Sequence, residues 1–116
     1  MVTIIAGSRT ITSYQVVEAA IRYAPWPVTE IVSGNARGVD LLGERYARRN
    51  KIRLTIMPAD WNQFGKRAGY RRNEVMAEHA QALIAIWDGV SKGTGHMIDI
   101  AHKKGLEVFV WRVDAA

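Results

Sequence analysis

The sequence predicts an α/β fold in which five mostly parallel strands form one sheet, with helices covering both of its faces. Short apolar runs alternate along the chain with longer segments whose apolar residues recur at helical spacing. One run, residues 83–87, is apolar throughout, which is typical of a strand buried on both faces of a parallel sheet. This alternation favours a three-layer sandwich with right-handed crossovers, and we expect the strand order 3-2-1-4-5.

The first half of the chain contains two strands, each followed by a helix. An apolar strand is predicted over residues 2–6. Thr12 begins a capping box, and the amphipathic helix that follows it ends at Pro25. A second strand covers residues 30–33, and a second helix covers residues 38–50.

The second half continues the alternation, with a loop over residues 58–66 that carries the aromatic residues Trp61 and Phe64. The pattern predicts strands over residues 53–57, 82–87 and 107–112, and helices over residues 68–81 and 94–104. No repeat or linker interrupts the chain, so we expect residues 1–116 to form a single domain.

The 116 residues carry a formal net charge of +5 and include no cysteine. The basic balance favours an anionic partner, although a solvated basic face has the same composition. The lack of cysteine excludes disulfides and thiolate metal sites and fits a cytoplasmic location. No segment has the roughly 20 apolar residues that span a bilayer, so no membrane partner is expected.

Glycine and hydroxyl residues follow three of the five predicted strands. Because the carboxyl ends of parallel strands meet at one edge, these loops predict a ligand site there, where backbone N–H groups can hold a phosphate. The alternative is that the glycines only make tight turns. The candidate ligand-binding residues are Gly7, Ser8 and Arg9 after the first strand, Ser33, Gly34, Asn35 and Asp40 after the second, and Ser91, Gly93 and Thr94 after the fourth.

Several of these residues have two interpretations. Thr94 either donates a hydroxyl to a phosphate or only caps its helix, and Arg9 either holds a phosphate or lies on the surface. Asp40 either hydrogen-bonds a ribose or caps its own helix. Arg72 and Asn73 open the helix over residues 68–81 and provide a second grip on an anion.

Other patterns exclude alternative chemistries. Neither a Gly-x-Gly-x-x-Gly dinucleotide motif nor a P-loop is present. Trp61 is the better candidate for stacking on a base, whereas Trp87 ends a buried strand and is more typical of a core. The three histidines do not share a ligand-like spacing with carboxylates, so neither a metal nor a cofactor is expected.

Nearly the whole chain resembles one family, in order. Residues 7–9, 33–40, 58–61, 72–76 and 87–94 resemble the YspA-like branch of the SLOG superfamily. The resemblance implies a Rossmann-like fold, a nucleotide-related ligand and a bacterial or phage source. The superfamily includes lonely-guy phosphoribohydrolases, the DNA-processing protein that loads recombinase, and sensor domains. This chain has Asn35 where members usually have a second glycine.

The resemblance is incomplete at the positions of the catalytic residues of the hydrolases. The hydrolases use an arginine in an Arg-x-x-x-Met setting and a glutamate shortly after a Gly-Thr pair. Arg72 and Met76 match the first pattern. No glutamate follows Thr94, and the helix offers the shorter and displaced Asp99 instead.

We therefore predict a domain that binds or senses a nucleotide or nucleotide-derived phosphorylated ligand. A non-catalytic domain is favoured over an enzyme. Two alternatives remain open. One is a hydrolase of the N-glycosidic bond of nucleoside monophosphates, with Arg72 and Asp99 as its catalytic residues. The other is a nucleic-acid-binding accessory protein. Homo-oligomerisation is also left open.

Overall fold

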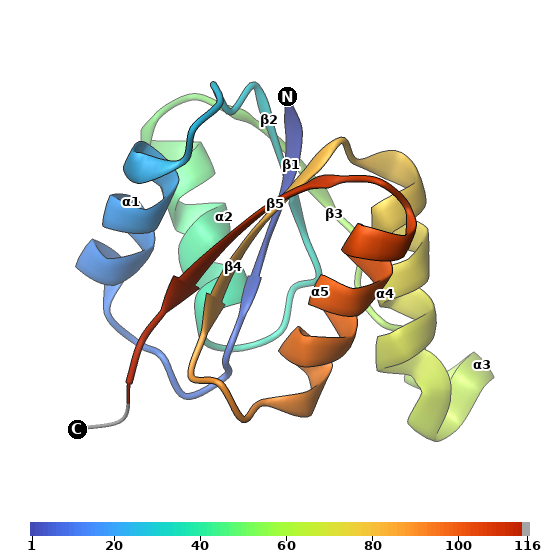
Figure 1. Ribbon diagram of the computed structural model, residues 1–116. Coiled ribbons are helices and arrows are strands. Elements are labelled where there is room, and N and C mark those ends of the chain that lie inside the picture. Colours follow the sequence, from blue (N-terminus) through green and yellow to red (C-terminus); the bar gives the residue numbers. More distant parts are fainter. Residues whose placement is uncertain (115–116) are drawn as a thin grey trace.

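The computed structural model describes residues 1–114 and has one sheet at its centre (Figure 1). The five strands are all parallel and lie in the order β3-β2-β1-β4-β5, which confirms the predicted fold and strand order. The strands are β1 (Val2–Gly7), β2 (Glu30–Ser33), β3 (Arg53–Ile56), β4 (Ala82–Trp87) and β5 (Glu107–Arg112). Residues 115–116 of the predicted domain lie outside the described residues.

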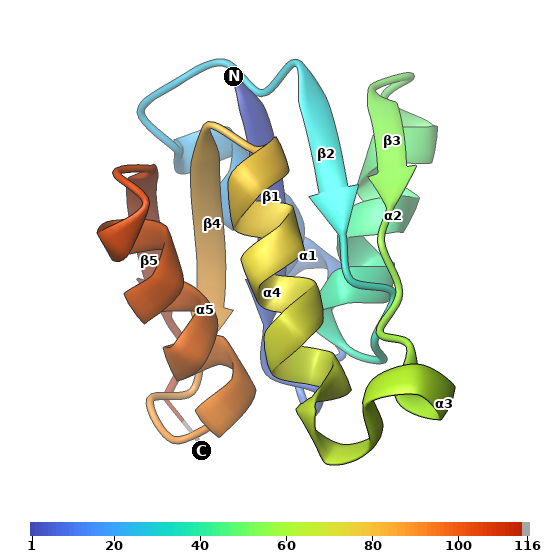
Figure 2. The same cartoon turned by 90° about the vertical axis from the view of Figure 1, so that its right-hand side faces the viewer.

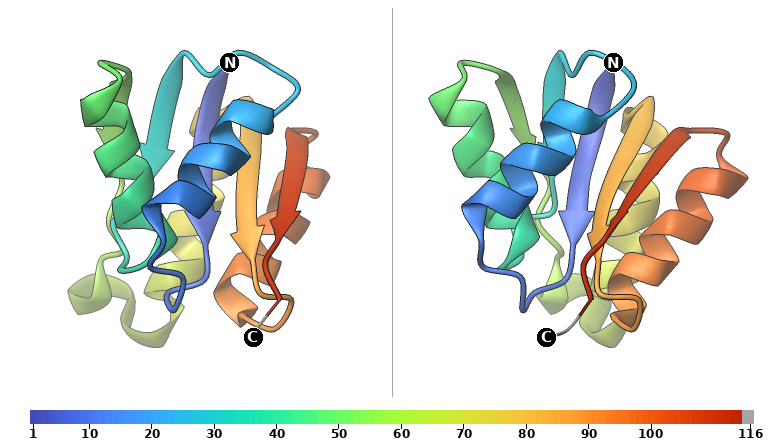
Figure 3. Two further views of the ribbon diagram at one scale, coloured as in Figure 1. Left: turned by 90° about the vertical axis from the view of Figure 1, so that its left-hand side faces the viewer. Right: turned by 60° about the vertical axis from the view of Figure 1, so that its left-hand side comes forward.

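Helices cover the sheet on both faces. Two of them, α1 (Tyr14–Tyr23) and α2 (Val39–Arg49), lie on one face, and α4 (Ala68–His79) and α5 (Lys92–Lys103) lie on the other (Figures 1 and 3). The short helix α3 (Trp61–Phe64) and the 3-10 turn η1 (Gly65–Arg67) precede α4. Figure 2 shows α3 below the arrowheads of β2 and β3, beyond the carboxyl ends of the strands.

Three of the differences from the predicted elements have local reasons. Helix α1 is capped by Ser13 rather than Thr12, because the Ser13 hydroxyl accepts the N–H of Val16 at 3.4 Å. The predicted loop over residues 58–66 contains α3, where the Asp60 carboxylate caps the helix by accepting the N–H of Gln63 at 3.0 Å. Helix α5 begins at Lys92, two residues before its predicted start at Thr94, because Gly93 lies in its first turn rather than in the preceding loop.

Two apolar cores, one on each face of the sheet, explain why β4 is apolar throughout. Its residues alternate between the core under α4 and α5, which includes Leu83 and Ala85, and the core under α1 and α2, which includes Ile84 and Ile86. All four of these side chains are 0% exposed. Among residues 1–114, no helix combines the length and the apolar character that crossing a membrane requires.

The topology places several loops at one edge of the sheet. The chain passes from β1 outward to β2 and β3, and then returns through α4 to β4 on the other side of β1. Strand order therefore reverses between β1 and β4, and a crevice forms beyond their carboxyl ends at such a point. The loops that follow β1, β2 and β4 open toward this edge.

Candidate functional site

A cleft of about 420 Å³ lies at the carboxyl ends of β1 and β4, between the loops and the starts of α4 and α5. We call it the inner cleft. It contains most of the residues that the sequence singles out, in agreement with the topological argument. The predicted residues that line it are Gly7, Arg9, Asp40, Trp61, Arg72, Asn73, Ser91, Gly93 and Thr94.

A second and more open depression of about 710 Å³ adjoins the inner cleft. We call it the outer groove. The loop after β2 and the segment before α3 form it, and Gly34, Asn35, Arg37, Pro58 and Ala59 line it. Four residues line both spaces and form a shared wall, namely Arg9, Ala36, Trp61 and Arg72.

Two predicted ligand residues, Ser8 and Ser33, lie beneath the site and line neither space. Ser8 is 1% exposed, and its hydroxyl accepts the N–H of Asp88 at 3.1 Å. Ser33 is 0% exposed, and its hydroxyl donates to Glu44 Oε2 at 2.7 Å and accepts the N–H of Asn35 at 3.1 Å. Both serines therefore hold the loops in place, and their hydroxyls are already engaged.

The loop after β2 keeps its tight geometry although Asn35 stands where family members usually have glycine. Asn35 has a φ of 60°, in the left-handed region that asparagine tolerates better than most residues. Glycine is required more strictly at position 34, since a Cβ there would collide with the Arg72 guanidinium.

A chain of hydrogen bonds fixes Arg72 between this loop and α5. Its Nη1 donates to the carbonyl of Gly34, and its Nε donates to Asn73 Oδ1 at 3.0 Å. Asn73 Nδ2 in turn donates to the carbonyl of Gly93 at 3.3 Å. Burial lowers the pKa of Arg72, and the nearby carboxylate of Asp40 opposes that shift. Two hydrogen bonds thus hold the guanidinium at the cleft wall.

Asp40 is 5% exposed and is the only carboxylate that lines the inner cleft within residues 1–114. Burial raises its pKa to about 6, while the Ala36 N–H, Arg72 and Arg9 act in the opposite direction. Its Oδ2 accepts the N–H of Ala36 at 3.2 Å, so the carboxylate holds the loop after β2. Helix α2 begins after Gly38 without a side-chain cap.

Several cations line the inner cleft, and Asp40 is a carboxylate that acts electrostatically on two of them, Arg9 and Arg72. Within residues 1–114 none of these cations takes part in an ion pair, and neither does Arg37 of the outer groove. The sequence pattern does not single out Lys66, which lies in the unpredicted turn η1, or Lys92, because α5 begins two residues before its predicted start. The cations lining the inner cleft are Arg9, Lys66, Arg72 and Lys92.

The start of α5 faces the inner cleft with its backbone N–H groups uncapped by a side chain. Ser91, the N-cap residue, makes no capping bond, because its hydroxyl donates to Asp88 Oδ2 at 2.9 Å. Asp88 also accepts the N–H groups of Val90 and Ser91, and these bonds lower its pKa to about 2. A Cβ at Gly93 would meet nothing within 4 Å, so a ligand can approach this turn closely.

Of the two tryptophans that the sequence singles out, Trp61 is exposed at the site and Trp87 is packed. Trp61 is 53% exposed and lines both spaces. Trp87 is packed, with its Nε1 donating to the carbonyl of Ser91 at 3.1 Å. Tyr70, which sequence analysis did not single out, is 45% exposed and lines the inner cleft, with its ring centroid 4.3 Å from that of His96.

Asp99, the candidate hydrolytic carboxylate, is exposed on α5 and lines neither space. Arg72, its proposed catalytic partner, does line the inner cleft. Across residues 1–114, no three His, Asp or Glu side chains are grouped so that they could hold a metal ion.

The fold and the cleft at the switch point define a Rossmann-like domain of the SLOG type. The chain belongs to the family described as the YspA, cpYpsA-related SLOG family (YAcAr), whose family model matches residues 1–64. The gene 61 protein of Mycobacterium phage D29 is 37% identical over 84 residues, which cover 67% of each chain. The prophage-derived protein YoqJ of Bacillus subtilis is 37% identical over 43 residues, which cover 37% of this chain and 25% of YoqJ.

A solved structure shares the fold at low sequence identity. DNA processing protein A from Streptococcus pneumoniae superposes with a TM-score of 0.77 and 19% identity over 94% of this chain. The match covers 49% of that protein, so this chain spans about half the length of the structure that it matches.

Proposed function

We propose that this chain forms a non-catalytic binding or sensing domain that takes a nucleotide or nucleotide-derived phosphorylated ligand in the inner cleft. The observation that carries the proposal is the group of cations without ion-pair partners around the uncapped start of α5. A phosphate neutralises such a group and accepts hydrogen bonds from the helix N–H groups. The lack of cysteine supports a cytoplasmic location for this activity.

The lining supports one orientation of the ligand. The phosphate lies at the start of α5, against the N–H groups of Gly93 and Thr94, with Arg9 and Lys92 beside it. The base lies toward Trp61 and Tyr70, whose exposed rings offer stacking surfaces. A nucleotide has both of these parts, whereas inorganic phosphate would leave the aromatic side unused.

The contacts favour binding over hydrolysis. Cleavage of an N-glycosidic bond needs a carboxylate near the sugar to stabilise the oxocarbenium-like transition state or to activate water. Asp99 does not line the cleft. Asp40 does, but it is buried and accepts the N–H of Ala36.

The proposal is tested by comparing Arg9→Ala with Asp99→Asn. We expect Arg9→Ala to weaken binding of nucleoside monophosphates at least about tenfold, because the loss of a charge-assisted hydrogen bond costs about 1.5–3 kcal/mol. Asp99→Asn changes affinity little. Isothermal titration with a panel of nucleoside 5′-monophosphates and ADP-ribose measures both effects.

A chromatographic assay for released base, run on the same three proteins, separates binding from hydrolysis. We expect no free base from any of them. Base release by the wild type that disappears in Asp99→Asn would establish the hydrolase and contradict the non-catalytic proposal.

A second candidate function is nucleic-acid binding at the same edge. The net charge of +5 favours it, as does the fold shared with a protein named for DNA processing. The two candidates differ in salt dependence. Binding of a strand releases counterions from many phosphates and weakens steeply with salt, whereas a mononucleotide site responds less.

A further inference from the structure

Asn73 connects Arg72 to the first turn of α5, and the hydrogen bonds around its amide fit one orientation only. Arg72 Nε donates to Asn73 Oδ1 at 3.0 Å. A guanidinium can only donate, so the atom that faces it must be the amide oxygen. The amide nitrogen then faces α5, where it donates to the carbonyl of Gly93 at 3.3 Å. Because Asn73 is 5% exposed, water cannot readily replace these partners.

His96 of α5 lies beside this amide, at the contact between α4 and α5 (Figure 2). Its Nδ1 is 3.2 Å from Asn73 Nδ2. Since Asn73 Nδ2 is a donor in this orientation, Nδ1 of His96 must be unprotonated and accept the bond, and the neutral imidazole carries its proton on Nε2. The ring of Tyr70 packs against the imidazole from α4, with the two centroids 4.3 Å apart. These contacts therefore favour one tautomer of His96 and disfavour its protonated form.

We propose, on the basis of the function proposed above, that His96 is a positioning residue of the inner cleft, which keeps Arg72 and the start of α5 in their binding arrangement only while its imidazole is neutral. Protonation adds a donor at Nδ1, directly opposite the Asn73 Nδ2 donor. The amide can restore its bond to His96 only by turning its oxygen away from Arg72. Arg72 Nε then loses its acceptor, and the carbonyl of Gly93 loses a donor.

The charged groups around His96 set the pH range of this change. Burial lowers the pKa of His96 below its ordinary value of 6.5, and Lys103 on the same helix acts in the same direction. The carboxylates of Glu74 on α4 and Asp99 on α5 oppose the shift. His96 is therefore neutral at neutral pH, and we expect its protonation to weaken ligand binding as the solution is acidified.

Two other ionisations fall in the same pH range, so the test compares proteins at one pH rather than one protein across pH. Asp40 lines the cleft and has a pKa of about 6, and the loss of its charge favours an anion as pH falls. The second proton of a phosphate monoester also titrates near about pH 6. Both ionisations act alike in wild type and in a His96 variant. The ratio of their affinities therefore isolates the contribution of His96.

The test is isothermal titration with nucleoside 5′-monophosphates, at about pH 7.5 and about pH 5, into wild type, His96→Asn and His102→Asn. The Oδ1 of asparagine can take the position of the histidine Nδ1, so His96→Asn keeps an acceptor that does not titrate. His102→Asn is the matched control, because it removes an exposed histidine of α5 that lines neither space.

We expect His96→Asn to bind as wild type does at about pH 7.5 and at least about fivefold more tightly than wild type at about pH 5. His102→Asn should match wild type at both. An affinity ratio between His96→Asn and wild type that stays the same at the two pH values overturns the positioning role while the nucleotide site stands.

A second measurement examines the hydrogen bonds without a ligand. Nitrogen NMR of the imidazole distinguishes the two neutral tautomers, and we expect the Nε2–H form of His96 at neutral pH. The Nδ1–H form would overturn the inference whatever the affinities are. If no monophosphate binds the wild type, the nucleotide site falls, and the positioning role falls with it even where the Nε2–H form is found.

Discussion

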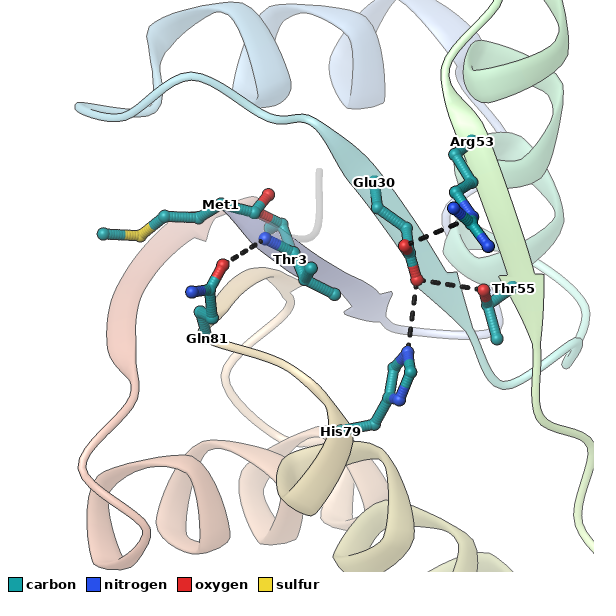
Figure 4. A network of polar contacts seen from close by, with 8 residues as sticks. Met1, Thr3, Glu30, Arg53, Thr55, His79 and Gln81 are labelled. Atoms are coloured by element: carbon teal, nitrogen blue, oxygen red, sulfur yellow. Dashed lines mark hydrogen bonds and ion pairs between the residues drawn. The ribbon is translucent and has the colours of Figure 1, made fainter.

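The charged side chains at the two edges of the sheet differ in how they are paired. At the amino edge, Glu30 opens β2 and is surrounded by partners, as Figure 4 shows. Its Oε2 accepts from Thr55 Oγ1 at 3.0 Å and lies 3.2 Å from His79 Nε2, at the end of α4. Its Oε1 lies 3.6 Å from Arg53 Nε. At the carboxyl edge, the cations of the inner cleft have no ion-pair partner within residues 1–114.

The two carboxylates of these edges have pKa shifts of opposite sign. The pKa of Glu30 is lowered, mainly by its hydrogen bond with His79. The pKa of Asp40 is raised to about 6, mainly by burial. Glu30 is therefore stabilised in its charged form by its partners, whereas burial of Asp40 at the carboxyl edge disfavours its charged form despite the nearby Arg72 and Arg9.

The largest expected effect is on the backbone of the carboxyl edge. Gly38 has a φ of 81°, and a Cβ there would lie 2.6 Å from the carbonyl oxygens of Ser8 and Arg9. We expect Gly38→Ala to lower the free energy of unfolding by at least about 3 kcal/mol, from backbone strain and this collision together. Urea denaturation measures the loss.

Gly93→Ala is the matched control for this substitution. Gly93 lies in the first turn of α5, and a Cβ would meet nothing within 4 Å. Alanine favours a helix over glycine by about 0.5–1 kcal/mol, so stability should stay equal or rise. If both variants lost stability equally, the special role of the Gly38 conformation would be refuted.

The next effect is the pH dependence that Asp40 confers. Because its folded pKa of about 6 exceeds the ordinary value of 3.8, the folded protein binds the proton more tightly than the unfolded chain. Asp40 therefore lowers stability as pH rises from about 4 to about 6, by up to about 3 kcal/mol at 1.36 kcal/mol per pKa unit.

Asp40→Asn removes this dependence while the amide oxygen still accepts the N–H of Ala36. We expect the variant to be more stable than wild type at pH 7 and equal to it near pH 4, as measured by thermal unfolding across that range. A variant that is less stable at pH 7 would mean that the charge of Asp40, rather than its hydrogen bond, supports the fold.

The smallest effect is expected at the amino edge. Glu30→Gln weakens the contacts to His79 and Arg53, and we expect a loss of about 1 kcal/mol at neutral pH. Since the pKa of Glu30 is lowered, the stability it provides is present above its ordinary value of 4.5 and is lost as pH falls. The difference between variant and wild type should therefore shrink on acidification, and urea unfolding at descending pH measures it.

The fold could be predicted from the sequence because its signals are local and repeated. Strands β2, β4 and β5 have the predicted bounds, since apolar runs end at turn residues there. The start of α5 was predicted two residues too late, because Gly93 favours a loop by propensity alone. Packing of Met97, Ile98 and Ala101 against the sheet overrides that propensity.

The position of the candidate site could be predicted from the sequence, but the roles of several of its side chains could not. Residues at the ends of parallel strands must meet, which brings Gly7, Arg9 and Thr94 into one cleft. The roles of Ser8 and Ser33 could not be read from the sequence, because a buried hydroxyl and a ligand-facing hydroxyl have the same local pattern. Lys66 lies in the turn η1, which the sequence pattern did not predict, and it lines the cleft together with Tyr70 of α4.

The most direct test of the contrast between the two edges is the affinity of the nucleoside monophosphate panel for three proteins, measured by isothermal titration at constant salt. The proteins are wild type, Arg9→Ala at the carboxyl edge and Glu30→Gln at the amino edge. The charge contrast predicts that Arg9→Ala loses at least about tenfold in affinity with little change in stability, and that Glu30→Gln loses stability but binds as wild type does. Equal loss of affinity in both variants, or full affinity in Arg9→Ala, would contradict it.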